Sequence, residues 1–251
     1  MWLRRWTPRP GATLRLLCLP HAGGSAAAFR SWADLLPLTV ELVAVEPPGR
    51  GDRFGEPFAA GVDDVLDGVL TGLAALPRKP LAVFGHSLGA LLALRVCREL
   101  RRRSSMSGQG PAALLVSSCP APAAAAERMA GQRGCDDDGL LAQVRGLGGP
   151  AVDAGPDVLA AVRADLALFA DGVGEAPPLN SPLRVYAGDG DDSVSPATLA
   201  AWRRESPGDF RLTMLPGGHF FFSDREPLFL ARLAADIGQL STVETTNGIP
   251  R

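Results

Sequence analysis

The chain has 251 residues, of which 46% are hydrophobic and 21% are charged, and its formal net charge is −2 at pH 7. This balance is typical of one globular domain with its own core, and it provides no basic field that would favour nucleic acid as a partner. No apolar run approaches the ~20 residues that cross a bilayer, no secretory signal opens the chain, and the four cysteines lack metal-type spacing. We therefore expect a cytoplasmic protein with reduced thiols, no membrane partner and no metal.

The first half of the chain alternates short apolar runs with helical patterns. The runs are bulky and uninterrupted, as expected of buried strands, whereas the segments between them repeat apolar residues at helical spacing. Strands are predicted at 14–19, 41–45, 81–84 and 113–117, and helices from about 26, over 62–76 and from 90 to about 103. Strands that alternate with helices favour a mostly parallel central sheet covered by helices on both faces.

Residues 120–182 interrupt this alternation. The segment combines Ala-rich and Gly/Pro-rich pieces with short helical patterns, such as 159–169, and contains no strong strand. Strands return at 183–187 and 210–214, and helices at 196–204 and 226–240. We expect one domain over residues 1–240, with a helical lid inserted above the carboxyl ends of the strands, where open α/β sheets place their active sites. The polar residues 241–251 are predicted to form a disordered tail.

A Gly-x-Ser-x-Gly pattern joins the third predicted strand to the helix that follows it. The segment is Gly85-His86-Ser87-Leu88-Gly89. In α/β-hydrolases such a segment is a sharp, strained turn, the nucleophile elbow, which holds the serine hydroxyl clear of the sheet at the positive end of the helix. The pattern alone could arise by chance in a glycine-rich chain, but the strand before it and the helix after it favour the elbow, with Ser87 as nucleophile.

A serine hydroxyl is a poor nucleophile and needs a general base within hydrogen-bond reach. The chain has three histidines, and in α/β-hydrolases the base follows the serine and the acid along the chain. His21 precedes Ser87 and His86 adjoins it, so His219, in a glycine-rich loop after the last predicted strand, is the predicted base. The alternative is a histidine that only packs or lies at the surface.

Three aspartates follow the strand at 183–187 and are candidates for the acid of a triad. Asp189 lies nearest the strand, where turn carboxylates often bond only to their own loop. Asp191 lies in the middle of the loop, from which it could reach His219, and Asp192 is the next choice. The chemistry requires one carboxylate to orient the imidazole and stabilise its charged form. Spacing favours Asp191 without excluding the others.

Hydrolysis through a tetrahedral intermediate also requires backbone N–H donors for the oxyanion. One donor is expected directly after the nucleophile, at Leu88, and the other in a loop after an early strand. His21-Ala22-Gly23-Gly24 is that loop, and Ala22 is the predicted donor. The alternative for the loop is a plain glycine turn.

Taken together, these segments resemble the type II thioesterases that accompany modular polyketide and nonribosomal peptide synthases. The likeness extends to about Leu240. Its most specific parts are the early His-Ala-Gly-Gly loop and the late Gly-Gly-His-Phe-Phe segment, because many hydrolases share the elbow. The matching segments are Leu19-Pro20-His21-Ala22-Gly23-Gly24, Pro48-Gly49-Arg50, Gly85-His86-Ser87-Leu88-Gly89, Leu147-Gly148-Gly149, Ala187-Gly188-Asp189-Gly190-Asp191 and Pro216-Gly217-Gly218-His219-Phe220-Phe221.

The resemblance implies an α/β-hydrolase fold and hydrolysis of aberrant or stalled acyl groups from the phosphopantetheine arm of acyl or peptidyl carrier domains. In that family the acid is the second aspartate of its loop, which corresponds to Asp191, and an oxyanion donor lies at the position of Ala22. The insertion corresponds to the family's lid over an acyl chamber, and no metal or bound cofactor is implied. The chain departs from the family at Asp192, where proline is common, which puts the stiffness of that loop in doubt.

Several alternatives remain open at this point. The activity could be that of an esterase for small soluble esters, which needs no carrier-docking surface, or of a chain-releasing or medium-chain acyl thioesterase. A noncatalytic binding protein on the same scaffold is disfavoured by the intact serine, aspartate and histidine. We expect a monomer. Apolar residues that could line the chamber, although such residues more often belong to the core, are Phe29, Met129, Leu166, Phe169, Phe220 and Phe221.

Overall fold

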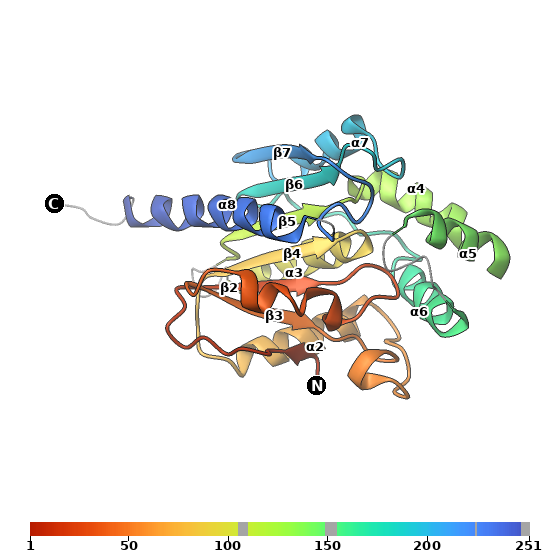
Figure 1. The fold of residues 1–251 in the computed structure, drawn as a ribbon, viewed down its shortest axis with the longest axis horizontal. Coiled ribbons are helices and arrows are strands. Elements are labelled where there is room, and N and C mark those ends of the chain that lie inside the picture. The colour runs from red at the N-terminus through yellow and green to blue at the C-terminus, as the bar shows by residue number, and fades with distance from the viewer. Residues whose placement is uncertain (105–109, 149–154, 224, 247–251) are drawn as a thin grey trace.

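The computed structural model describes residues 1–104, 110–148, 155–223 and 225–246. The strands are β1 (Leu3–Arg4), β2 (Leu14–Leu19), β3 (Val40–Val45), β4 (Leu81–His86), β5 (Ala113–Ser117), β6 (Leu183–Gly188) and β7 (Phe210–Leu215). They form one seven-stranded sheet in the order β1-β3-β2-β4-β5-β6-β7 (Figure 1). β2 to β7 are paired in parallel, whereas β1 runs antiparallel to β3 at one edge.

Helices connect these strands and extend the chain beyond the last of them. The α-helices are α1 (Trp32–Leu35), α2 (Val62–Ala74), α3 (Leu88–Ser104), α4 (Pro122–Arg133), α5 (Asp137–Gly146), α6 (Pro156–Ala167), α7 (Pro196–Ala200) and α8 (Glu226–Thr246), and the 3-10 helices are η1 (Ala26–Phe29), η2 (Gly51–Arg53) and η4 (Ala201–Arg204). Within the described part of the chain, none of these helices has the length and apolar character needed to cross a membrane.

Alternating strand residues build two cores, one on each face of the sheet. Leu17 and Val83 belong to the cluster that packs against α2 and α3, whereas Leu16 and Phe84 belong to the cluster on the other face. On that second face α1 contributes Trp32, and α8 contributes a run of apolar residues. Because both faces are covered, the strands are apolar at successive positions rather than at every second one.

Helices α4, α5 and α6 form an insertion between β5 and β6. Figure 1 shows them gathered at one end of the sheet, beyond the arrowheads of the parallel strands. Since β5 and β6 are neighbours in the sheet, the insertion leaves and rejoins the sheet at adjacent positions. The arrangement places a helical layer over the carboxyl ends of the strands, where the loops after β2, β4 and β7 also lie.

The mostly parallel sheet with helices on both faces, the α/β-hydrolase architecture, is confirmed, and the main strands lie where the apolar runs predict them. The helix expected from about residue 26 is instead a 3-10 turn followed by the short α1, and the helix expected at 196–204 divides into α7 and η4. α8 continues to Thr246, beyond the expected end at 240, and residues 247–251 of the expected tail lie outside the described residues. β1 was not predicted, because two residues carry no periodicity.

Candidate active site

Ser87 occupies the turn between β4 and α3 and has a φ of 54°, in the left-handed region that non-glycine residues rarely adopt. Its N–H donates a hydrogen bond of 2.8 Å to the carbonyl oxygen of Ser117 at the end of β5. A Cβ at Gly85 would overlap the carbonyl oxygen of Gly89, and a Cβ at Gly89 would overlap that of Pro20. The two glycines therefore allow the strand and the helix to approach closely, and the tight turn leaves the Ser87 side chain partly exposed.

His219 lies in the loop after β7 with only 3% of its surface exposed. Its Nδ1 lies 3.0 Å from Asp191 Oδ2. A proton on Nδ1 is the tautomer that this carboxylate favours, and it leaves the lone pair of Nε2 free to accept a proton. Nε2 is buried and has no hydrogen-bond partner among the described residues, and Ser87 lines the same pocket. The imidazole can thus act as a general base for an acidic group in that pocket.

The structure distinguishes the three candidate aspartates. Asp191 is 6% exposed and bonds to the imidazole of His219, whereas Asp192 is exposed. Asp189 accepts a hydrogen bond of 3.1 Å from the N–H of Gly217, so it braces the loop that carries His219 without touching the ring. Burial would raise the pKa of Asp191, but hydrogen bonds from His219 and Ser193 outweigh burial and lower that pKa to about 2.

Ser193 completes this hydrogen-bond network, although the sequence analysis did not single it out. Its N–H donates to Asp191 Oδ1 at 3.0 Å, and its Oγ lies 3.0 Å from Nδ1 of His219. An aspartate that accepts from the N–H two residues later is the common Asx turn, so the Asp-x-Ser spacing was a usable signal. The network holds the carboxylate in one orientation before any substrate binds.

Ser87 and His219 line one pocket together with Ala22 and Leu88. Its empty space, counted with the mouth that opens to solvent, is about 680 Å³. In the part of the chain that the structure describes, neither the Ala22 N–H nor the Leu88 N–H donates a hydrogen bond. Two free donors therefore border the pocket beside a hydroxyl and an imidazole. The apolar part of the wall comes from Leu91, Ala125, Met129, Val144, Leu147, Val162, Leu166 and Phe220.

Three of the six chamber candidates contribute to this wall, and three do not. The prediction was wrong for Phe29, which packs against Trp32 and Phe84 with ring centroids 5.0 and 6.0 Å apart. It was also wrong for Phe169, which is buried in the core cluster beside α2 and α3, and for Phe221, whose ring lies 5.3 Å from that of Phe229. Helical spacing and apolar character do not indicate which core an aromatic side chain joins.

Ser118 lines the pocket, and no sequence pattern marked it. It follows β5 with a φ of 48°, and its hydroxyl is buried with no hydrogen-bond partner in the part of the chain that the structure describes. Its N–H donates to the carbonyl oxygen of Tyr186 at 2.9 Å, which holds the strained backbone in place. A strained residue with an unpaired buried hydroxyl is costly for the fold.

Two of the three histidines, His21 and His219, line this pocket, and His86 lies behind them. The ring of His86 lies 5.0 Å from that of His219, and the ring of His21 lies 5.0 Å from that of Phe220. Burial, with smaller contributions from His219 and Arg50, lowers the pKa of His21 to about 4. Burial also lowers the pKa of His86 well below its ordinary value. Within the described residues, His219 is the one histidine that bonds to a carboxylate, which distinguishes the candidate base from the other two.

These shifts predict that the protein loses stability as the pH falls from about 6.5 toward 4. In that window the unfolded chain binds protons on His21 and His86, whereas the folded chain keeps both rings neutral, so acid favours unfolding. The free energy of unfolding should fall by up to about 1.4 kcal/mol per pH unit for each histidine. Urea denaturation at pH 7, 6 and 5 measures the slope, and His21→Asn should reduce it. A free energy that stays constant from pH 7 to pH 5 would contradict the prediction.

The chain is similar to known thioesterases over most of its length. The family model described as "Thioesterase domain" matches residues 14–237. The chain is 37% identical over 233 residues to the thioesterase PikA5 of Streptomyces venezuelae, covering 90% of this chain and 81% of that protein. Among solved structures, it is similar to the RedJ thioesterase from the prodiginine pathway of Streptomyces coelicolor, with a TM-score of 0.80, 34% identity, and 91% and 92% of the two chains covered. It is also similar to the type II thioesterase BorB from the borrelidin biosynthetic cluster, with a TM-score of 0.80, 32% identity, and 94% and 97% of the two chains covered.

Proposed function

This chain belongs to the thioesterase family, and we propose that it is a serine hydrolase that removes aberrant or stalled acyl groups from carrier domains of a polyketide or nonribosomal peptide synthase. The observation that carries this proposal is that Ser87 and His219 line one largely apolar pocket while Asp191 holds the imidazole. The substrate class is supported by the relatives, since RedJ belongs to the prodiginine biosynthetic pathway and BorB to the borrelidin cluster.

In the first half of the proposed reaction, Ser87 Oγ attacks the thioester carbonyl carbon as its proton moves to Nε2 of His219. Asp191 stabilises the imidazolium that forms, and the N–H groups of Ala22 and Leu88 bind the oxyanion of the tetrahedral intermediate. The intermediate collapses with cleavage of the C–S bond, and His219 returns the proton to the sulfur. The thiol is a good leaving group because its pKa of about 8.5 is far below that of an alcohol.

In the second half, water attacks the acyl-serine while His219 accepts a proton from it. The same two N–H groups bind the second oxyanion, and collapse releases the carboxylic acid as His219 protonates Ser87 Oγ. Each proton is accounted for by the serine, the histidine and water, so the proposed reaction needs no metal or bound cofactor.

The other parts of the proposal concern access and partners. The helices α4 to α6 act as a lid, because their residues supply much of the pocket wall. The partner is an acyl or peptidyl carrier domain whose phosphopantetheine arm carries the acyl group into this pocket. The protein acts as a monomer in the cytoplasm beside its synthase.

The substrate class is tested with one acyl group presented in three forms. Acetyl or propionyl groups are supplied on a carrier protein, on N-acetylcysteamine and as the p-nitrophenyl ester, and the released thiol or phenol is followed by absorbance. We expect kcat/KM to be highest for the carrier-bound form, by at least about tenfold, because binding energy from the carrier lowers the barrier. Far faster turnover of the nitrophenyl ester would favour a small-molecule esterase. Release of only long, finished chains from the carrier would favour a chain-releasing enzyme.

A further inference from the structure

Asp165 is a buried carboxylate of α6 to which the proposed reaction assigns no part. It is 7% exposed and accepts three hydrogen bonds from the loops that follow β2 and β3. Arg50, in the loop after β3, donates from Nη2 to Oδ1 at 2.8 Å and from Nη1 to Oδ2 at 2.5 Å. Gly23, in the loop after β2, donates its N–H to Oδ2 at 2.8 Å. Asp165 therefore joins the inserted helix α6 to both loops at once.

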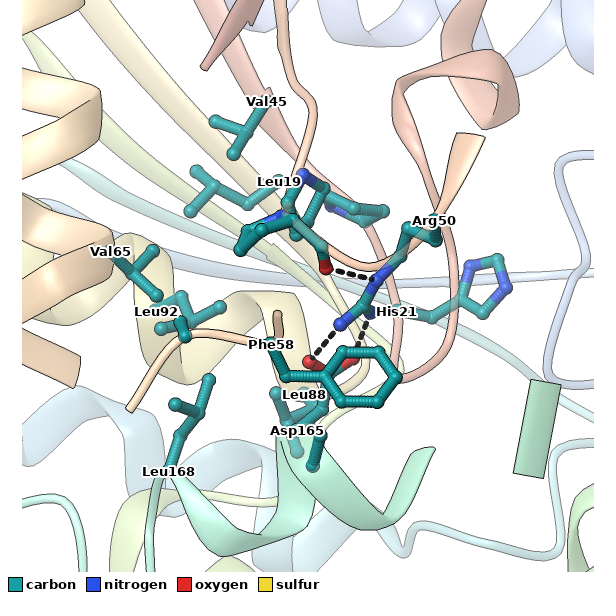
Figure 2. Close-up of a pocket in the computed structure, with 15 residues that line it drawn as sticks. Leu19, His21, Val45, Arg50, Phe58, Val65, Leu88, Leu92, Asp165 and Leu168 are labelled. Carbon is teal, nitrogen blue, oxygen red and sulfur yellow. Dashed lines mark hydrogen bonds and ion pairs between the residues drawn. The ribbon is translucent and has the colours of Figure 1, made fainter. Parts of the chain in front are cut away.

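Arg50 is held in place on its own side of this contact. Figure 2 shows its guanidinium pointing at Asp165, with the ring of Phe58 beside it. The carbon centre of the guanidinium lies 5.7 Å from the centroid of that ring, and Nε lies 3.4 Å from the carbonyl oxygen of Pro48. Arg50 is itself 7% exposed, so the pair is buried on both sides. Removing either partner would leave a charge that water reaches poorly, which is costly.

Gly23 touches α6 through its backbone as well as through its hydrogen bond. Its φ is +75°, and a Cβ there would lie 2.8 Å from Cγ2 of Val162 and 3.3 Å from the carbonyl oxygen of Val158. Val162 and Asp165 are three residues apart, so they lie on the same face of α6. The glycine therefore lets the loop backbone lie directly on that face.

The peptide that Asp165 holds is the one between Ala22 and Gly23. Ala22 is the proposed oxyanion donor, and its own N–H is free and borders the pocket. The direction of that N–H depends on the backbone at Ala22, which the hydrogen bond from Gly23 to Asp165 restrains. The carboxylate thus controls the geometry of a donor that it does not touch.

We propose that Asp165 is a positioning residue, with Arg50 as its counter-charge. It holds the oxyanion loop, residues 21–24, so that the N–H of Ala22 points at the site of the oxyanion. The N–H of Ala22 is therefore correctly oriented only while α6 packs against this loop. Closure of the insertion and assembly of the oxyanion site then occur together. This inference rests on the proposed function, since it assumes that Ala22 stabilises an oxyanion. It adds that the insertion takes part in transition-state stabilisation as well as in covering the substrate.

The test compares Asp165→Asn with a matched variant, Asp137→Asn. Asp137 is also an acidic residue of the insertion and pairs with Arg163 of α6 at 2.6 Å, but its side chain is 73% exposed and it does not contact the oxyanion loop. The first readout is amide hydrogen exchange of the segment 20–25, which needs no substrate. We expect faster exchange at Gly23 in Asp165→Asn, because its single amide oxygen replaces two carboxylate oxygens that accept from Gly23 and from both Nη atoms of Arg50. Exchange should be unchanged in Asp137→Asn.

The second readout is steady-state hydrolysis of p-nitrophenyl acetate, which does not require a carrier domain. We expect Asp165→Asn to lower kcat by about 10- to 100-fold with KM changed less than threefold, because an oxyanion donor acts in the transition state. Asp137→Asn should match the wild type. If Asp165→Asn does not fold by circular dichroism, Asp165→Asn/Arg50→Gln, which leaves no unpaired charge, should show the same loss of kcat.

Unchanged exchange at Gly23 would overturn the anchoring role, and faster exchange with an unchanged kcat would overturn the coupling to catalysis. An equal loss in Asp137→Asn would also overturn the proposal, because it would show that any disturbance of the insertion suffices. Failure of the proposed function would give a different result, because carrier-bound thioesters would then be poor substrates of the wild type. The p-nitrophenyl acetate assay would still allow Asp165→Asn and Asp137→Asn to be compared.

Discussion

Replacing Ser87 with alanine is expected to lower kcat for hydrolysis of a carrier-bound acyl group by at least about 10⁴-fold, with substrate affinity changed less than threefold. The hydroxyl forms the covalent bond in the proposed reaction, so its loss removes the acyl-enzyme route entirely. Only the slow attack of water, aided by the free N–H groups beside the pocket, would remain. Stopped-flow detection of the released thiol measures the rate, and mass spectrometry of the intact protein detects the acyl-serine.

The chain offers a matched control for this substitution at Ser118. This serine lines the same pocket, has a similarly strained backbone and carries a buried hydroxyl, but it follows β5 rather than lying in the turn between β4 and α3, and its hydroxyl has no hydrogen-bond partner among the described residues. Ser118→Ala should keep kcat within about tenfold of the wild type and should still form the acyl-enzyme. Equal rates in Ser87→Ala and the wild type, or an acyl group that maps to another residue, would reject Ser87 as the nucleophile.

Replacing Asp191 with asparagine is expected to lower kcat by about 10³- to 10⁴-fold, the second-largest effect. The amide has nearly the same shape as the carboxylate but no charge, so it cannot stabilise the imidazolium of His219. It can also donate to Nδ1, which would move the ring proton to Nε2 and remove the base. The three aspartates of this loop allow a direct comparison, with kcat and KM measured for the same substitution at each position.

Asp192→Asn should leave kcat unchanged, because this side chain is exposed. Asp189→Asn should cost less than about tenfold, because an asparagine oxygen can still accept the hydrogen bond from Gly217. Circular dichroism and the urea midpoint confirm that each variant is folded. A large loss at Asp189 or Asp192 with a small loss at Asp191 would contradict the proposed triad.

Much of the fold could be predicted because a sheet covered on both faces demands uninterrupted apolar strands. The runs at 14–19 and 113–117 coincide with β2 and β5, and the glycine spacing around Ser87 marked the close contact of β4 with α3. The segments chosen from the sequence also converge, since Ser87, His219, Ala22 and Leu88 line one pocket. Such residues belong to short motifs that can be recognised in a single sequence.

Other features depend on contacts between distant parts of the chain. Asp165 lies 142 positions from Gly23 and 115 from Arg50, and no local pattern in α6 distinguishes it from a solvated acidic residue. Ser118 adopts a left-handed backbone that favours glycine, so its conformation could not be predicted from its residue type. The pocket wall was only partly predicted because candidates that line it and candidates that do not belong to the same cores. Leu166 and Phe169 lie in one cluster and Phe220 and Phe221 in the other, but only Leu166 and Phe220 reach the pocket.

The position of the insertion between two neighbouring strands has a consequence for how such proteins can diversify. β5 and β6 pair directly, so a segment of a different length or helix content can replace residues 118–182 without changing the register of any strand. Exchange of this segment between homologues would therefore alter the size and shape of the pocket while Ser87, His219 and Asp191 stay on the unchanged scaffold. A graft of this kind must supply its own acidic side chain opposite Arg50, or the recipient would bind new acyl groups but hydrolyse them about 10- to 100-fold more slowly.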